Sequence, residues 1–288
     1  MNGGGAFETS ATARPVRPPG SLGRRQLLAR WRSLGIRPGD TLLVHASLKA
    51  VGTVRGGVRA VADSLSDAVG TEGTLVVYTQ TPDNSDPSRW HVTRGYAVPA
   101  AQWPRLRATL SAFDPARTPS FGVGVLPEEV RTRPGALRSG HPQSSFAALG
   151  PAAARITSGH ALDCHLGEDS PLARLEELGA RILLLGVGYS VCTAFHLAEY
   201  RVPGQGTRDY GCAVADGSGG RRWHRYRDVD FDASDFAELG ESYEALAQRP
   251  VTRGRVGGAD CRLFALAPAV AYACTWLTGR RAGRDRRS

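Results

Sequence analysis

Compact apolar runs alternate along the chain with longer segments whose apolar side chains recur every three or four positions. Runs bounded by turn residues predict buried β-strands at residues 41–45 (TLLVH), 74–79 (TLVVYT) and 181–186 (RILLLG), with a shorter candidate at 145–148. Apolar residues at helical spacing predict helices at residues 22–34, 58–69, 120–131, 171–179, 193–200 and 263–277. Because buried strands alternate with helices, the pattern indicates α/β layers.

Two regions depart from this alternation. Residues 80–118 are polar, interrupted by prolines and without a clear period, which is typical of a long loop with some helix that covers an active site. Residues 211–231 indicate antiparallel strands with a turn at 216–220. We therefore predict a three-layer α/β/α fold with a central mixed sheet, a smaller antiparallel region near 211–231 and a loop and helix lid near 80–118.

The ends of the chain differ from its body in composition and charge. Residues 1–20 are rich in Gly, Pro, Ala and Thr and cannot bury enough apolar surface to become ordered, and residues 280–288 look the same. We therefore expect one domain over 21–279 between two flexible basic tails. The net charge of +9 lies in the ends, because residues 1–33 carry +5 and residues 280–288 carry +4. The neutral body between them, residues 34–279, argues against a folded nucleic-acid-binding groove.

Composition also excludes several classes of protein. The five cysteines are scattered and form no CxxC pair, so we expect reduced thiols rather than a disulfide framework or a structural metal site. No apolar run reaches the roughly 18 residues that a membrane span needs, and no apolar segment near the N-terminus resembles a signal peptide. Hydrophobic residues make up 41% of the chain, which is enough for a packed core. We expect a cytoplasmic globular protein without a metal.

The strongest chemical signal follows the predicted strand at 181–186. His196 and Glu199 are three positions apart in a predicted helix, so their side chains share one face. A carboxylate beside an imidazole raises its basicity and fixes its tautomer, which suits a general base. The alternative is a solvated surface pair of the same spacing. HxxE is also part of a metal motif, but the sequence contains neither HExxH nor a cysteine cluster.

Two further loops carry polar groups suited to an anion. Residues 44–52 (VHASLKAVG) follow the first strand, and their small side chains leave backbone amides that can cradle an anionic group. Ser47 in this loop is equally suited to capping a helix. Residues 138–145 combine arginine, histidine and hydroxyl groups, which suits phosphate or carboxylate. The alternative for this second loop is a turn whose side chains bond the backbone.

Eight short segments stand out for their order and spacing. They are 42–52 (LLVHASLKAVG), 73–81 (GTLVVYTQT), 113–131 (FDPARTPSFGVGVLPEEVR), 137–153 (LRSGHPQSSFAALGPAA), 168–175 (EDSPLARL), 182–188 (ILLLGVG), 193–199 (TAFHLAE) and 253–264 (RGRVGGADCRLF). With them the chain resembles the aminoglycoside 3-N-acetyltransferases of the antibiotic N-acetyltransferase group, from about residue 27 to residue 277. That group is unrelated to the GNAT acetyltransferases, so the resemblance implies that the fold is not GNAT.

The resemblance implies a reaction and roles for particular residues. In the family the acceptor amine attacks acetyl-CoA directly, without an acyl-enzyme, and the catalytic histidine falls on His196 with Glu199 as its orienting carboxylate. Thr79, at the end of the second strand, is our candidate donor to the oxyanion. The residues expected to bind acetyl-CoA are His45, Ala46, Ser47, Leu48, Val51, Ser120, Arg138, His141 and Ser145.

An aminoglycoside acceptor is polycationic, so its subsite should be acidic. The candidate acids are Asp83, Asp86, Glu168, Asp169, Asp228 and Asp230. The expected acceptor is the 3-amino group of the 2-deoxystreptamine ring, or another such as a 2′-amine, with antibiotic resistance as the outcome. Residues 81–104 are least like the family pattern, so we expect them to shape acceptor choice. We expect acetyl-CoA as co-substrate, no metal, nucleic-acid or membrane partner, and a monomer or homodimer.

Three alternatives to this function remain. The same fold and reaction also serve an antibiotic-biosynthesis intermediate in some relatives, which a neutral or basic acceptor pocket would favour. The positive net charge suggests a non-enzymatic nucleic-acid-binding protein. A serine hydrolase would use Ser47 or Ser190, but the chain has no GxSxG motif, and residues 188–192 (GYSVC) break that motif at its last position.

Overall fold

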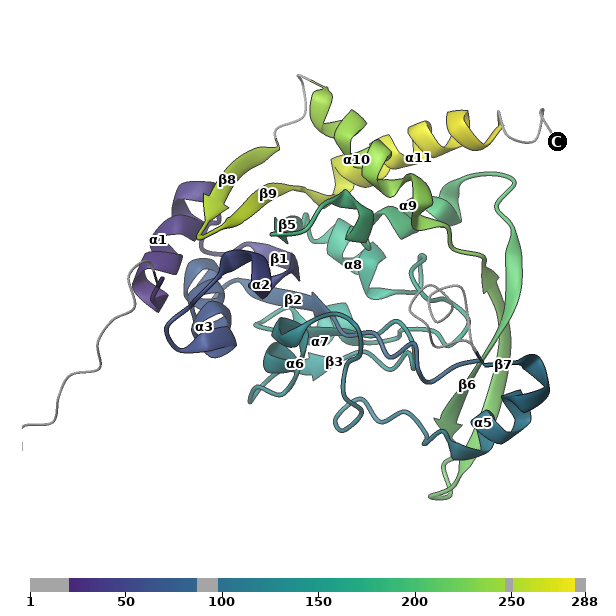
Figure 1. Cartoon of the computed structure of the whole chain (residues 1–288). Helices are drawn as coiled ribbons and strands as arrows, with labels where there is room; N and C mark the ends of the chain where they lie inside the picture. Colours follow the sequence, from purple (N-terminus) through teal and green to yellow (C-terminus); the bar gives the residue numbers. More distant parts are fainter. Residues whose placement is uncertain (1–20, 87–97, 247–250, 283–288) are drawn as a thin grey trace, which may run out of the picture.

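A seven-stranded mixed sheet forms the centre of the protein (Figure 1). The computed structural model describes residues 21–86, 98–246 and 251–282. The strands of the sheet in chain order are β1 (Thr41–Ala46), β2 (Thr74–Tyr78), β3 (Leu137–Arg138), β4 (Phe146–Leu149), β5 (Arg181–Leu185), β8 (Thr252–Val256) and β9 (Ala259–Ala265). Their spatial order is β3-β4-β2-β1-β5-β9-β8, with β1 parallel to β2 and β5 and the other neighbours antiparallel. The carboxyl ends of β1, β2 and β5 therefore meet at one edge of the sheet, where open α/β sheets place their ligands.

Helices cover both faces of this sheet and divide the hydrophobic core into two. Side chains alternate along each strand, so that Leu42 and Val44 face one core and Leu43 faces the other. The first core lies under α1 (Arg24–Leu34), α3 (Gly57–Val69) and α6 (Val125–Arg131). The second lies under α7 (Ala153–Thr157), α8 (Pro171–Glu177), α9 (Phe195–Arg201), α10 (Phe236–Ala245) and α11 (Leu266–Ala282). These layers confirm the predicted α/β/α fold.

The predicted antiparallel region and the predicted lid lie together beside the sheet (Figure 1). β6 (Thr207–Ala215) and β7 (Arg221–Val229) form a two-stranded ribbon, and the lid contains η1 (Ala100–Gln102) and α5 (Trp103–Thr109). Asn84 exchanges two hydrogen bonds of 3.0 Å with the backbone of Ala213, and Arg221 donates to carbonyl oxygens of α5. Ribbon and lid are thus joined, although residues 87–97 of the lid lie outside the described part of the chain.

The C-terminal helix differs from its prediction at both ends. The prediction of a helix over 263–277 is wrong at its start, because residues 263–265 belong to β9 and pair with β5. Pairing with a buried strand overrides the local helical spacing of apolar residues. α11 then continues to Ala282, so Arg280 and Arg281 are helical rather than part of a tail. Residues 1–20 and 283–288 of the predicted tails lie outside the described residues.

Smaller differences concern short elements. The helix predicted over 120–131 begins only at Val125, because Ser120 is bound to Glu128 ahead of the helix. β3, β8, α7 and α10 are absent from the prediction, and for β3, β8 and α7 the reason is that elements of two to five residues carry little periodicity. All five cysteines are free, in line with the predicted reduced thiols. Within the described ranges no helix is long and apolar enough to cross a membrane.

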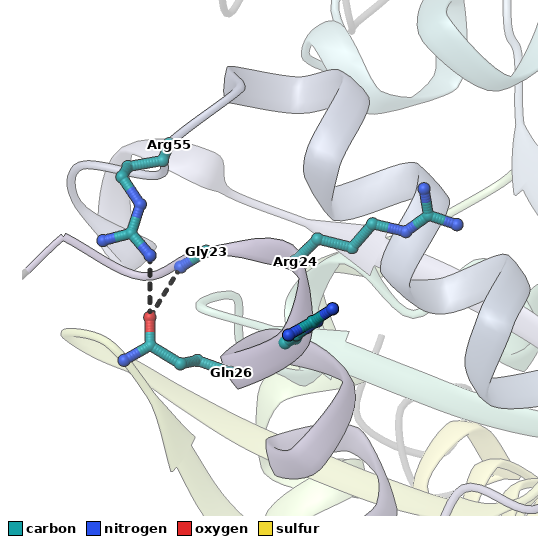
Figure 2. Close-up of a pocket in the computed structure, with 5 residues that line it drawn as sticks. Gly23, Arg24, Gln26 and Arg55 are labelled. Carbon is teal, nitrogen blue, oxygen red and sulfur yellow. Dashed lines mark hydrogen bonds between the residues drawn. The ribbon is translucent and has the colours of Figure 1, made fainter. Parts of the chain in front are cut away.

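A hollow at the start of α1 shows how the basic residues of this region are used (Figure 2). It has a volume of about 270 Å³ and is lined by Gly23, Arg24, Arg25, Gln26 and Arg55. The side-chain oxygen of Gln26 accepts from the Gly23 amide at 2.9 Å and from Arg55 at 3.3 Å. Arg24 pairs with Asp67 of α3 at 2.7 Å. These contacts join α1 to α3 on the face of the sheet opposite α9, so the hollow belongs to helix packing.

Candidate active site

The loops after the parallel strands bring the predicted site residues to one edge of the sheet. Ser47 follows β1, Thr79 follows β2 and Gly186 follows β5. Gly186 has a φ of +64°, and a Cβ there would lie 2.6 Å from that of Ala50, so this position requires glycine. The close approach packs the loop after β1 against the loop after β5. α9 begins a few residues further, at Phe195, and covers the same edge.

His196 and Glu199 form a hydrogen-bonded pair on one face of α9. The Nδ1–H group of His196 donates to Oε2 of Glu199 at 2.6 Å. The Glu199 carboxylate is fully buried, and its second oxygen accepts from Arg281 at 2.8 Å and from the Asp232 amide at 3.1 Å. In the tautomer that carries its proton on Nδ1, Nε2 carries the lone pair. The predicted spacing thus produces an oriented imidazole.

The environment of His196 leaves that lone pair accessible. Its ring packs against Phe231 and Phe236, with centroid separations of 5.0 and 4.7 Å. The side chain keeps 17% of its surface exposed, whereas that of Glu199 keeps none. No hydrogen-bond partner for Nε2 is found among the residues that the structure describes. An oriented imidazole with a free Nε2 can accept a proton from a substrate.

A second histidine–carboxylate pair, which the sequence did not reveal, lies nearby. The Nδ1–H group of His165 donates to Asp228 at 2.7 Å, and Tyr200 donates to the same carboxylate oxygen at 2.7 Å. Burial opposes ionisation of Asp228, but hydrogen bonds, led by that from His165, outweigh it and hold its pKa below the usual value. Nε2 of His165 lies 3.0 Å from both Gln143 Oε1 and the Tyr226 hydroxyl. Both ring nitrogens are therefore occupied, and burial lowers the pKa of the ring.

A cavity of about 150 Å³ separates the end of β2 from the ribbon. Its lining includes Tyr78, Asp86, Gln143, His165, Arg208, Tyr210 and Phe231. The Phe231 ring contacts His165 at 5.4 Å and His196 at 5.0 Å, both measured between ring centroids. Phe231 therefore stands between the cavity and the His196–Glu199 pair. No pattern along the sequence signals this residue, because its place depends on the path of the chain after β7.

The predicted acceptor-binding acids are dispersed, and most have a basic partner. The pairs are Asp86–Arg107 at 2.7 Å, Glu168–Arg201 at 2.7 Å, Asp228–His165 at 2.7 Å and Asp230–Arg208 at 3.8 Å. Asp83 and Asp169 lie on the surface. Of the six, Asp86 lines the cavity. The structure thus brings one of these acids to the cavity and compensates its charge with an arginine.

The predicted cofactor loop contains one buried polar atom without a partner. His45 and Ala46 end β1, and Ser47 precedes the single turn of α2 (Leu48–Val51) without a side-chain capping bond. Burial lowers the pKa of His45 to about 4, so its ring is neutral. Nε2 of His45 has no hydrogen-bond partner in the described part of the chain. A buried polar atom in that state is costly, so it is suited to a ligand group.

Thr79, Arg138 and Ser145 form a separate cluster. The Nε–H group of Arg138 donates to the hydroxyl oxygens of Thr79 at 3.1 Å and Ser145 at 2.9 Å, and Nη2 donates to the Thr79 carbonyl at 2.6 Å. Burial lowers the pKa of Arg138 to about 10. Thr79 is fully buried, and strand alternation points it away from the face of Tyr78, which lines the cavity. The Thr79 hydroxyl is thus engaged internally rather than exposed to an oxyanion.

The two remaining cofactor candidates also bond within the protein. Ser120 donates to Glu128 through its amide at 3.0 Å and its hydroxyl at 2.9 Å, and Arg131, the main cause, lowers the pKa of Glu128 to about 2. His141 is fully buried, and its Nδ1 accepts from the amides of Gln143 and Ser144 at 3.2 and 3.1 Å. The contacts of His141 Nδ1 are of the kind that a turn with side chains bonded to the backbone would have, whereas its Nε2 is buried and has no hydrogen-bond partner in the described part of the chain.

The chain is similar in sequence to proteins named for one activity. A family model described as aminoglycoside 3-N-acetyltransferase matches residues 43–278. The chain is 39% identical over 247 residues to the SPbeta prophage-derived aminoglycoside N(3′)-acetyltransferase-like protein YokD of Bacillus subtilis, covering 85% of this chain and 89% of that protein. It is 36% identical over 286 residues to aminoglycoside N(3)-acetyltransferase VIII of Streptomyces fradiae, covering 93% and 96%.

Solved structures of similar proteins share the fold. The crystal structure of YokD from Bacillus subtilis has a TM-score of 0.85 at 36% identity and covers 91% of this chain and 95% of its own. A structure described as AAC-IIIb binary with CoASH has a TM-score of 0.77 at 32% identity, with coverages of 90% and 97%. A structure described as AAC-VIa bound to sisomicin has a TM-score of 0.77 at 31% identity, with coverages of 90% and 98%.

Proposed function

Because the chain belongs to the aminoglycoside 3-N-acetyltransferase family and is therefore an acetyl-CoA-dependent N-acetyltransferase, we propose that His196 is its general base and an aminoglycoside amine its acceptor. The observation that carries this proposal is the pair formed by His196 and Glu199. The 2.6 Å hydrogen bond to a buried carboxylate orients the ring and leaves Nε2 as its basic atom. An amine must lose a proton as it becomes acylated, and Nε2 is the group that receives it.

The proposed transfer needs only the amine, acetyl-CoA and the His196–Glu199 pair. The lone pair of the neutral amine attacks the thioester carbonyl carbon, so that a C–N bond forms and the C–S bond of acetyl-CoA breaks. The proton of the attacking nitrogen passes to Nε2 of His196. The CoA thiolate leaves and takes the proton from Nε2, which returns His196 to its neutral form. Glu199 stabilises the transient imidazolium, and no acyl-enzyme is formed.

We assign acetyl-CoA to the loop after β1. Two observations support this assignment. Nε2 of His45 is buried without a partner among the described residues, and Ser47 makes no side-chain capping bond. Both residues lie at the carboxyl edge of the parallel strands. A solved relative described as a binary complex with CoASH shares the fold. Ser120, Arg138 and Ser145 are already bonded internally, so we assign them a structural role that supports this edge.

We assign the acceptor to the cavity beside Phe231. Tyr78, Tyr210 and Phe231 line the cavity, and aromatic side chains are suited to a sugar or an ammonium group. Phe231 also touches His196. A solved relative is described as bound to sisomicin. The proposed acceptor group is the 3-amino group of the 2-deoxystreptamine ring, and its acetylation would give resistance to the antibiotic.

The proposal is tested by following thiol release from acetyl-CoA with the purified full-length chain. The panel contains sisomicin, other 2-deoxystreptamine antibiotics and an aminoglycoside without that ring. Release with the first group, followed by mass spectrometry that places one acetyl group on the 3-amine, is the expected result. CoA binding without release for any member would contradict an aminoglycoside acceptor.

One observation favours a second acceptor class. Asp86 is paired with Arg107, and Arg208 offsets Asp209 in the lining, so the cavity carries little net negative charge for a polycationic ligand. An antibiotic-biosynthesis intermediate with fewer ammonium groups would suit such a cavity. The two candidates are separated by comparing kcat/KM for acceptors that carry one amine with kcat/KM for acceptors that carry four or five.

A further inference from the structure

Arg281 reaches the catalytic pair from the last described turns of α11. Its Nη2 group donates to Oε1 of Glu199 at 2.8 Å and to the Asp232 carbonyl at 3.1 Å, and its Nη1 group donates to Gln205. The Arg281 side chain is 16% exposed and the Glu199 side chain 0%. A residue 82 positions away in sequence is therefore the cation that contacts the buried carboxylate.

We propose that Arg281 is a positioning residue of the acetyl-transfer reaction, which holds the Glu199 carboxylate in place and tunes the proton affinity of His196 through it. This inference rests on the proposed role of His196 as general base. It concerns a residue that does not touch either substrate, because Glu199 lies between Arg281 and the histidine.

The two oxygens of the Glu199 carboxylate have different partners. Oε2 of Glu199 accepts from His196, and Oε1 accepts from Arg281 and from the Asp232 amide. The contacts on Oε1 fix the rotation of the carboxylate, so that Oε2 points at Nδ1. With Arg281 removed, the carboxylate retains one amide donor on that side and is freer to turn.

The positive charge of Arg281 also affects the electrostatics of the pair. A buried carboxylate whose only cationic partner is an imidazolium favours the protonated ring. Arg281 already supplies a positive charge to Glu199, so the ring gains less from its own protonation. Removing Arg281 should leave more of the enzyme with a protonated and inactive His196.

The charged and titratable groups near the His196–Glu199 pair come from several elements. Arg281 lies on α11, the amide of Asp232 after β7 contacts Glu199, and His165 lies in the loop before α8. Arg201, Glu168 and Glu176 form a cluster at the far end of α9. Burial lowers the pKa of His165, which keeps that ring uncharged beside His196. Of these groups, Arg281 is the one whose charge is in direct contact with Glu199.

The neighbouring arginine provides a matched control. Arg280 lies on the same turn of α11 but pairs with Glu238 at the surface, at 2.7 Å, and its side chain is 44% exposed. Arg280→Gln removes the same charge from the same helix without touching Glu199. A difference between Arg280→Gln and Arg281→Gln therefore reports on the contact with Glu199 rather than on the net charge of the C-terminus.

The experiment measures kcat and KM for both substrates from pH 5.5 to 9.5 in the full-length wild type and in Arg281→Gln, Arg281→Lys and Arg280→Gln. We expect Arg281→Gln to lower kcat about 10-fold or more at pH 7, with the acid limb of the profile moved up by about one pH unit. The KM for acetyl-CoA should stay within about twofold. Arg281→Lys, which keeps the charge, should recover the pH profile more than the rate, and Arg280→Gln should behave as wild type.

Several outcomes would overturn the inference. A wild-type rate and pH profile in Arg281→Gln would show that the contact is irrelevant to catalysis. An equal loss at every pH that Arg281→Lys does not reduce, accompanied by a lower melting temperature, would show a purely structural role. Failure of the underlying function is distinguishable, because His196→Ala would then retain wild-type turnover whatever the Arg281 variants do.

Discussion

Two histidine–carboxylate pairs contact the same Phe231 ring and differ in what surrounds their second ring nitrogen. His196 donates to Glu199 at 2.6 Å and His165 donates to Asp228 at 2.7 Å, so the two hydrogen bonds are nearly equal. Nε2 of His165 is enclosed by Gln143 and Tyr226, whereas Nε2 of His196 faces no partner among the described residues. A carboxylate neighbour orients an imidazole, but only an accessible lone pair allows the ring to act as a base.

The two pairs also differ in how the chain builds them. His196 and Glu199 are three residues apart on α9, so a single helix turn creates the contact. His165 and Asp228 are 63 residues apart, and their bond ties the loop before α8 to β7 of the ribbon. The first pair thus belongs to catalysis in our proposal, and the second holds the cavity wall together.

The largest expected effect is the loss of turnover in His196→Ala. Turnover should fall by a factor of about 10² to 10⁴, which is the usual contribution of a general base to the rate, with little change in the affinity for CoA. Thiol release from acetyl-CoA measures the rate, and CoA binding is measured by calorimetry. His224→Ala, which changes a histidine on the ribbon, is the matched control. Wild-type turnover in purified, folded His196→Ala would refute the proposed mechanism.

Glu199→Gln should have the next largest effect. The imidazole remains, but it loses the carboxylate that orients it and stabilises its protonated form, so we expect a loss of about 10- to 10²-fold in kcat, which is part of the whole contribution of the general base. The amide keeps the shape of the side chain, which limits structural damage. If kcat were unchanged and CoA binding were lost instead, Glu199 would belong to the cofactor site.

His165→Gln should show the opposite pattern, with a smaller effect on kcat and a larger one on stability. Asp228 would lose a buried donor, which costs about 1–3 kcal/mol of unfolding free energy. Urea denaturation measures that loss, and His196→Gln is the comparison, with lower activity and near wild-type stability. A loss of turnover in His165→Gln as large as that in His196→Ala would mean that the two pairs act together in catalysis.

The pH dependence of stability sharpens the same contrast. The folded pKa of His165 lies below the ordinary value of 6.5, mainly because of burial. Its unfolded form therefore binds a proton first as the pH falls, and the free energy of unfolding decreases below about pH 6.5. His165→Gln should show a shallower decrease than wild type between pH 7 and 5 in urea denaturation. Identical slopes would argue that the His165 ring is charged in the folded protein.

Arg107→Gln should have the smallest effect and should change the acceptor rather than the chemistry. It removes the ion pair of 2.7 Å between Arg107 and Asp86 at the cavity. The KM for a polycationic acceptor should therefore fall about two- to fivefold. The gain should shrink as salt is added. Arg155→Gln, which breaks the exposed pair with Glu177, is the control. A weaker KM for polycationic acceptors in Arg107→Gln would contradict the view that this arginine limits acceptor charge.

Periodicity along the chain was sufficient for much of the fold. The strands β1, β2 and β5 and the helices α1, α3 and α8 match the predicted segments closely. Each of these strands is a short continuous apolar run, and each of these helices buries the face that the spacing of its apolar residues defines. β9 was mistaken for the start of a helix, since its apolar residues are compatible with either structure until β5 pairs with them. The resemblance of eight segments to one family added the reaction, which periodicity alone does not contain.

The sequence by itself determined the His196–Glu199 pair, because a contact between residues three apart needs only a helix turn. The tertiary structure decided which partners complete it. Arg281 lay in a predicted tail, yet α11 carries it to a carboxylate 82 positions away. The same holds for the His165–Asp228 bond, for Phe231 at the cavity and for Thr79, which faces Arg138 rather than the cavity. Local spacing encodes which side of an element is buried, whereas contacts between distant residues depend on how the elements pack.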